Sequence, residues 1–234
     1  MNIIDFAILA VLFVSIIFGF YRGSVATLFG LAACLISVVI AFFADPHLSA
    51  LLSGNHGVTE MLTTYTDAGS LVGDYALATT KVEGISEALI QTVLKSVSLP
   101  DCIETILHSN LSNAAFASAG LTTVNDYVSA TIVAVVLQSF SFVLCYFAAF
   151  ILLHAVIGLI GHVFYYPVLK HLDGVVGGIY GLLRGIVTLY VLFLLMPVIR
   201  TIIPSDLITR YLGEGILSSV FASDSFFARI VSGI

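Results

Sequence analysis

The chain has 234 residues, of which 59% are hydrophobic and only 9% are charged. Soluble domains carry about 25% charged residues, so this composition excludes an ordinary soluble domain and indicates an integral membrane protein. The formal net charge is −6, and eight lysines and arginines are too few to neutralise a nucleic-acid backbone, which excludes nucleic acid as a partner.

The N-terminal part of the chain predicts a helical hairpin. Residues 3–20 and 25–44 are two apolar runs long enough to cross a bilayer. The first run opens with Asn2 and Asp5, which can cap a helix and complement its dipole. Gly19–Gly23 (G-F-Y-R-G) predicts a tight interfacial reversal, and Asp45-Pro46 predicts the end of the second span. The absence of a positively charged start argues against a cleaved signal peptide, so the first run is expected to be a retained span.

Residues 45–126 change character and become acidic. They keep enough leucine, isoleucine and valine to exclude a disordered tail. Val82, Ile85, Leu89, Val93 and Val97 follow helical spacing. Ser98-Leu99-Pro100 then predicts a stop and a restart, with Pro100 in the first turn of the next helix. We expect three or four short amphipathic helices that cap the bundle or lie on the membrane surface.

The third apolar run, residues 127–160, exceeds what a bilayer requires, which predicts tilt or projection. Gly158, Gly161 and Pro167 are expected to end it. After the fourth run, the tail (residues 200–234) has helical periodicity interrupted by glycines and acidic residues, which favours an interfacial amphipathic helix over a further span.

The fourth run, Val175–Ile199, is the most informative. Gly177, Gly181 and Gly185 recur every four residues and therefore lie along one side of a helix, where they allow close approach of another helix. Arg184 lies within the same span, and its side chain must face protein or water instead of lipid.

These observations predict an all-α membrane protein. Its four-span bundle would comprise a first hairpin (1–44), a helical insertion outside the membrane (45–126), a second hairpin (127–199) and an amphipathic tail (200–234). G-F-Y-R-G at Gly19 and G-L-L-R-G at Gly181 share the form G-x-x-R-G. This similarity is either a repeat with a binding site between the halves or two independent small-residue contacts.

Two stretches carry a family resemblance. G-F-Y-R-G after Asp5, and L-D-G-V-V-G-G-I-Y-G-L-L-R-G at 172–185, together resemble the colicin V production (CvpA) family of bacterial inner-membrane proteins. The resemblance implies four spans in the bacterial inner (plasma) membrane and a link to toxin production, toxin export or envelope stress tolerance. The central insertion is longer than in compact members of the family. The residues after the fourth run leave no room for the protease domain that some relatives carry, so we expect none there.

The resemblance implies no catalytic residue and transfers only the positions of the motifs. The positions are Asp5, Gly19, Arg22, Gly23, Asp173, Gly181, Arg184 and Gly185.

Arg184 is the leading functional candidate, as a cation that binds an anion or lines a polar path. The alternative is structural, in which Arg184 pairs with Asp5, Asp173 or helix-end carbonyls. Arg22 is interpreted as interfacial and Asp173 as a helix cap.

Neither a cofactor nor a metal site is expected. His154, His162 and His171 do not share a helix face, and the cysteines (Cys34, Cys102 and Cys145) form no C-x-x-C pair. No nucleophile or acid–base pair is recognisable, so we expect no enzyme.

Two functional hypotheses remain. The first is a non-enzymatic membrane factor acting through protein partners or as a homo-oligomer, and the second is a small oligomeric channel or transporter for anions or small solutes. A weaker third is an anchor for a separate protease. Arg22 and Lys170 lie in the short turns on one side, with Arg200 and Arg210 on the other, so charge is balanced. The acidic insertion favours placing residues 45–126 and both termini outside the cytoplasm.

Overall fold

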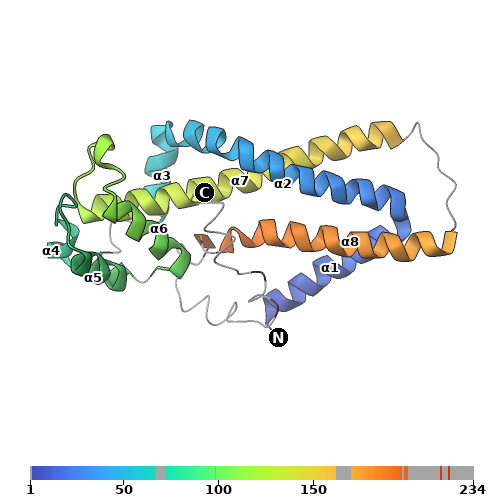
Figure 1. The fold of residues 1–234 in the computed structure, drawn as a ribbon, viewed down its shortest axis with the longest axis horizontal. Helices are drawn as coiled ribbons and strands as arrows, with labels where there is room; N and C mark the ends of the chain where they lie inside the picture. The colour runs from blue at the N-terminus through green and yellow to red at the C-terminus, as the bar shows by residue number, and fades with distance from the viewer. Residues whose placement is uncertain are drawn as a thin grey trace. The chain divides into compact units, whose positions relative to one another are not determined.

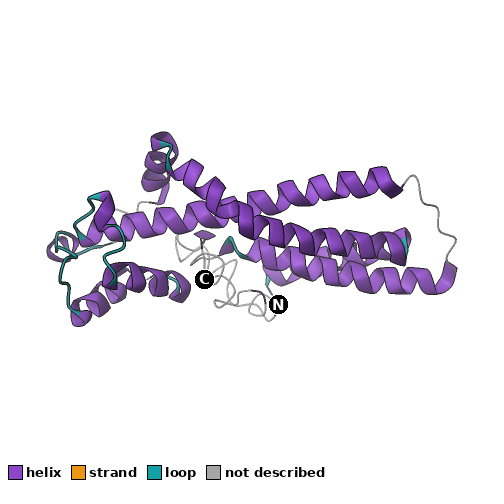
Figure 2. Ribbon diagram, turned by 45° about the horizontal axis from the view of Figure 1, so that its top comes forward, coloured by secondary structure: helices purple, strands orange, loops and turns teal. Residues whose placement is uncertain are grey.

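The computed structural model describes residues 2–66, 72–97, 99–161, 170–196, 198–199, 217 and 221. Over these residues the chain is helical without strands, apart from an isolated bridge between Lys81 and Thr123 (Figures 1 and 2). The predicted all-α class is therefore confirmed. The elements are α1 (Ile3–Arg22), α2 (Ser24–Ser53), α3 (His56–Thr66), α4 (Tyr75–Ala78), α5 (Glu87–Val97), α6 (Asp101–Ser112), the 3-10 turn η1 (Ala117–Ala119), α7 (Val124–Gly161) and α8 (Lys170–Phe193).

Four of these helices are long and apolar enough to cross a membrane. The candidate spans are Ile3–Arg22, Ser24–Ser53, Val124–Leu159 and Asp173–Phe193. Large apolar side chains on α1 and α2, such as Phe13 and Phe43, are mostly exposed, which is the arrangement expected of surfaces that face lipid.

The chain divides into two compact units. Unit 1 comprises the described parts of residues 1–47, 141–195 and 206–222, and unit 2 comprises those of 48–140, 196–205 and 223–234. Unit 1 therefore holds α1, most of α2, the later part of α7 and α8. Unit 2 holds α3 to α6 and the beginning of α7.

The predicted stop at Asp45-Pro46 is wrong, because α2 continues through Pro46 to Ser53. Proline removes one backbone donor from the helix ladder and crowds the carbonyl four residues earlier. Apolar helices nevertheless tolerate proline where neighbouring groups compensate the freed backbone carbonyl. The Asp45 side chain is 3% exposed, so this part of α2 is packed and not a surface turn.

Helix α7 runs unbroken for 38 residues. At 1.5 Å per residue it is about 57 Å long, whereas the hydrocarbon core of a bilayer is about 30 Å thick. The residues of α7 before Ser141 belong to unit 2 and those from Ser141 onward to unit 1, so both units share this helix. Gly158 lies inside the helix and does not end it, whereas Gly161 is its last residue.

Helix α8 ends at Phe193, six residues before the predicted end. Leu194 and Leu195 donate to carbonyls three residues earlier, Val191 and Leu192, and so tighten the chain into a turn. Most of the tail, with its predicted amphipathic helix, lies outside the described residues. Phe221 is described, and it packs against Ile8 and Leu189 within unit 1.

The insertion contains the expected short helices, with two corrections. Helix α5 begins at Glu87, because Gly84 adopts a positive φ of 75° and Val82 donates its backbone N–H to Thr122 at 3.0 Å. Pro100 is the N-cap of α6 and not part of its first turn.

Unit 2 has a hydrophobic core of its own. Its largest fully buried side chains come from α5, α6 and the beginning of α7, and they include Ile90, Ile103, Leu107, Leu111, Tyr127 and Ile132. The Asn110 amide also donates to the Thr131 hydroxyl at 3.0 Å and ties α6 to α7. Burial of this kind stabilises short helices that would be marginal alone.

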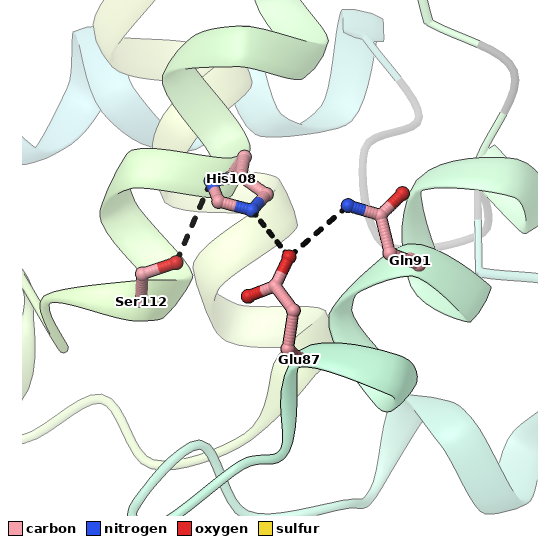
Figure 3. A network of polar contacts seen from close by, with 4 residues as sticks. All are labelled: Glu87, Gln91, His108 and Ser112. Carbon is pink, nitrogen blue, oxygen red and sulfur yellow. Dashed lines mark hydrogen bonds and ion pairs between the residues drawn. The ribbon is translucent and has the colours of Figure 1, made fainter.

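A polar network links α5 to α6 on the exposed side of unit 2 (Figure 3). His108 Nε2 donates to the Glu87 carboxylate at 2.8 Å, and the Gln91 amide donates to the same oxygen at 3.1 Å. The His108 hydrogen bond, followed by that of Gln91, holds the pKa of the Glu87 carboxyl below its ordinary value.

This network predicts a small acid-sensitive contribution to stability. A carboxyl whose pKa is lowered by folding stabilises the protein above its unfolded pKa, and the contribution is lost as pH falls through the folded pKa. Glu87→Gln is therefore expected to lower the melting temperature of the purified protein in detergent at about pH 6, with the difference from wild type shrinking towards about pH 3.

Glu83→Gln is the matched control, because Glu83 is an exposed carboxylate in the turn before α5. An equal loss at both pH values in Glu87→Gln would contradict the role given to the network.

Candidate functional site

The motif residues of unit 1 other than Asp5 lie where α1, α2 and α8 come together. A single residue, Gly23, separates α1 from α2, with φ 82° and ψ 166°. This conformation disfavours residues with a side chain, so glycine is required here. The Thr27 hydroxyl donates to the Gly23 carbonyl at 2.7 Å, which compensates part of the broken helix ladder. The tight reversal predicted for Gly19–Gly23 is confirmed.

Asp173 closes this turn from α8. Its Oδ1 accepts the Ser24 backbone N–H at 2.6 Å and also the Ser24 hydroxyl. A carboxylate at the first N–H groups of a helix satisfies donors that have no partner within the helix and complements the helix dipole. Asp173 therefore caps α2, not α8, on which it lies. The cap predicted from the sequence is present, but it acts on a different helix.

The glycines of α1 and α8 allow the two backbones to touch. A Cβ atom built on Gly19 would lie well inside contact distance of the Gly177 carbonyl oxygen, and one on Gly177 would meet the Gly19 carbonyl oxygen. A Cβ on Gly181 would meet the Ser15 carbonyl oxygen in the same way. No flexible side chain separates the helices, so any larger residue at these positions must push the backbones apart. Helices α1 and α8 are the most extensively packed pair along the described chain.

Ser15 extends the small-residue contact by one turn. Its hydroxyl donates to the Gly181 carbonyl at 2.6 Å in a buried setting. A Cβ on Gly185 would come within 3.0 Å of the Ser15 Cβ. The role of Ser15 in this contact was not predicted, although Ser15 lies four residues before Gly19 and so continues the same helix face.

Asp5 lies at the opposite end of α1 and is fully buried. Its Oδ2 accepts the Asn2 backbone N–H at 3.2 Å, and its Oδ1 accepts the Leu217 backbone N–H at 3.1 Å. Asp5 therefore caps the start of α1, as expected, and also holds a residue of the C-terminal segment.

Arg184 is half-buried on α8 and points towards α2. A Cβ on Gly30 would lie 3.4 Å from Arg184 Nη1 and 3.6 Å from His154 Nε2, so both nitrogens border the same point on α2. Within the described residues no carboxylate lies within ion-pair distance of Arg184. Asp5 and Asp173 have the partners given above, so neither is the predicted counter-ion.

His154 and Arg22 complete the surroundings of Arg184. His154 Nδ1 donates to the Phe150 carbonyl at 3.2 Å, and its ring packs on the Phe150 ring with centroids 4.2 Å apart. This hydrogen bond leaves Nε2 facing Gly30. Arg22, exposed at the end of α1, lies within electrostatic range of both Arg184 and His154. Two basic side chains, from α7 and α8, therefore meet beside Gly30, and Arg22 on α1 carries a further positive charge within electrostatic range of them.

A neutral polar network lies one turn further along α8. Tyr146 Oη contacts Cys34 Sγ at 3.1 Å and the Thr188 hydroxyl at 3.3 Å, and Thr188 donates to the Arg184 carbonyl at 3.0 Å. Cys34 and Tyr146 are fully buried. Cys34 is thus a small buried residue, and its hydrogen bond to Tyr146 was not predictable from spacing.

The N-terminal part of the chain is similar to a known protein family. Residues 4–93 match the family model described as "Colicin V production protein". The resemblance to that family is confirmed. The match covers α1 to α4 and part of α5, and hence Asp5, Gly19, Arg22 and Gly23; the motif at 172–185 lies outside it. No curated protein and no solved structure gives a significant match to the chain.

The contact between α1 and α8 predicts a position-specific response to added methyl groups. Gly177→Ala is expected to lower the free energy of unfolding by about 1–3 kcal/mol, because its Cβ would overlap the α1 backbone. The measurement is unfolding of the purified protein in detergent micelles.

Gly178→Ala provides a control on the neighbouring residue. A Cβ at Gly178 would lie 3.6 Å from Ile16 Cγ2, an ordinary contact, so this variant should differ little from wild type. Alanine favours a helix more than glycine does, so equal destabilisation by both substitutions would show that the close contact at Gly177 does not set the response.

Proposed function

We propose that this chain is a non-enzymatic membrane factor of the colicin V production type, which acts through protein partners in toxin production or export or in envelope homeostasis. The observation that carries the proposal is the family match over residues 4–93, which spans the α1–α2 hairpin. The four helices able to cross a membrane support a multi-pass location, and we place them in the bacterial inner membrane.

The geometry of the motif residues supports a role as a scaffold. Gly19, Gly177 and Gly181 bring two backbones together, and Asp173 caps the neighbouring helix. These residues shape unit 1 and leave the outer sides of α1 and α2 apolar and exposed. Such surfaces fit the lipid bilayer and also fit helix–helix contact with a second copy or a membrane protein partner.

Orientation is part of the proposal. The acidic balance of residues 45–126 favours a place outside the cytoplasm for the helices of unit 2. The α1–α2 turn with Arg22 then faces the cytoplasm, in agreement with the preference of short basic connections for that side.

A complementation experiment tests the factor hypothesis. The full chain is expressed in a bacterial strain that lacks its own colicin V production protein, and secreted toxin activity and resistance to a membrane-active detergent are measured. Wild type and Gly178→Ala should restore at least one property. Gly177→Ala, compared at equal membrane abundance, should restore less because its α1–α8 contact is disturbed.

Failure of wild type to restore either property, with the protein present in the inner membrane, would contradict the proposal. Co-purification of a separate protease would instead support the anchor hypothesis.

The basic cluster favours a second candidate, an oligomeric channel or transporter for anions or small solutes. A half-buried arginine without a carboxylate partner among the described residues is a typical feature of substrate and ion paths. Liposomes reconstituted with the wild-type protein should then release anions. Arg184→Leu should abolish that flux or change which anions it carries. Absence of flux from folded wild-type protein would remove this candidate.

A further inference from the structure

Unit 1 contains a basic cluster, formed by Arg184, His154 and Arg22. Neither the family match nor the packing of α1 against α8 explains why these basic side chains lie near one another. Arg184 Nη1 and His154 Nε2 border the same point above Gly30, and Arg22 lies within electrostatic range of both. An arginine is always charged in a protein, so at least two positive charges repel one another here.

The Arg184 side chain reaches back towards the α1–α2 turn. Helical side chains tilt towards the N-terminus of their helix, and α8 begins beside this turn, where Asp173 meets Ser24. Arg184 lies eleven residues from Asp173, about 16 Å along the axis, whereas Gly30 lies six residues from Ser24, about 9 Å. The guanidinium therefore lies nearer to the turn than its own backbone does.

No carboxylate in the described part of unit 1 forms an ion pair with these side chains. Asp173 accepts its hydrogen bonds from Ser24 at the α1–α2 turn, and the other described carboxylates of unit 1 are Asp5 and Asp45. Asp5 lies 17 residues before Arg22 on α1, about 25 Å along the axis, and Asp45 lies 15 residues beyond Gly30 on α2, about 22 Å. Both carboxylates therefore lie far beyond ion-pair distance of the cluster.

We propose that Arg184, His154 and Arg22 bind the phosphate group of an anion above Gly30. The inference uses the same basic cluster as the second candidate function and is independent of the first, and the phosphate can belong to an anionic lipid headgroup or to a free solute.

Phosphate is the anion class that fits these donors best. A guanidinium presents paired N–H donors that match two phosphate oxygens, and two arginines from different helices can serve different oxygens of one group. Because His154 Nδ1 donates to the Phe150 carbonyl, Nε2 can donate to a phosphate oxygen at the same point only when the ring is protonated, a form that a bound anion stabilises. The absence of a side chain on Gly30 leaves Nη1 and Nε2 without an intervening Cβ. Basic pockets between helices near one membrane face are also the usual sites for phosphate headgroups.

The test measures binding to the purified full chain in a zwitterionic detergent. Thermal unfolding is followed while inorganic phosphate or a short-chain phosphatidylglycerol is added, with sodium chloride holding the ionic strength constant. At least one probe should raise the melting temperature saturably. Saturation by phosphate identifies a solute site, and saturation by the lipid alone identifies a headgroup site.

Three variants connect binding to the cluster. Arg184→Gln should weaken binding by about tenfold or more, and Arg184→Lys should be intermediate because the charge stays and the paired donors are lost. Gly30→Leu keeps both arginines but places a side chain at the point that Nη1 and Nε2 border, so it should also weaken binding. Lys95→Gln, which removes a positive charge from α5 in unit 2, is the control and should bind as wild type.

Two outcomes would overturn the inference. One is the absence of a saturable shift with either probe in folded wild-type protein. The other is an affinity in both Arg184→Gln and Gly30→Leu within twofold of wild type, which would mean that the probe binds elsewhere. Because Gly30→Leu changes no charge, it keeps the test decisive if Arg184→Gln does not fold.

Discussion

The direct contact between the backbones of α1 and α8 is the constraint on which unit 1 depends. Glycine carbonyl and Cα atoms of the two helices touch at Gly19, Gly177 and Gly181, and the Ser15 hydroxyl bridges the same contact. In a bilayer the lipid tails are as apolar as the side chains, so burial of leucine gives little drive for helices to associate. Close van der Waals packing of small residues supplies that drive instead. The closeness of α1 and α8 then determines where Asp173 and Arg184, both on α8, meet α2.

This contact explains why one segment serves both structure and chemistry. Gly177 and Gly181 lie on the side of α8 that faces α1, whereas Arg184 extends towards Gly30 on α2. The Cys34–Tyr146–Thr188 network joins α2, α7 and α8 one turn further along. The basic cluster is thus held between a rigid glycine contact and a neutral polar network. Such a fixed surrounding lets like charges stay close together without the helices separating, and an anion in the cluster would relieve their repulsion.

Much of the fold was predictable because the bilayer imposes simple rules. Length and hydropathy predict four spans, and four-residue glycine spacing predicts the α8 face that packs closely. The extension of α2 through Pro46 was not predictable, since it depends on packing around a buried Asp45. The start of α5 at Glu87 was also missed, because Gly84 and the backbone bonds to Thr80 and Thr122 outweigh a helical pattern that continues from Val82.

The candidate site was only half predictable for a related reason. Arg184 and Arg22 stand out as cations in apolar surroundings, but their neighbourhood depends on contacts between distant segments. The spacing of His154 bears only on a metal site and does not predict its contact with Arg184. Gly30 was not predictable, because a glycine in an apolar helix gives no sign of what faces it. The partner of Asp173 was likewise hidden, since a carboxylate at the start of one helix is normally assigned to that helix and here it caps another.

The single-residue connection at Gly23 has a consequence for how the protein enters the membrane. With no loop between α1 and α2, the two helices are joined at one end from the moment α2 is synthesised, so they enter the lipid as neighbours. Because Thr27 and Gly23 make their hydrogen bond within the hairpin, its turn can form before α8 has been synthesised. Asp173 lies 149 residues beyond Ser24, so the cap on α2 is completed only after that stretch of chain has been made.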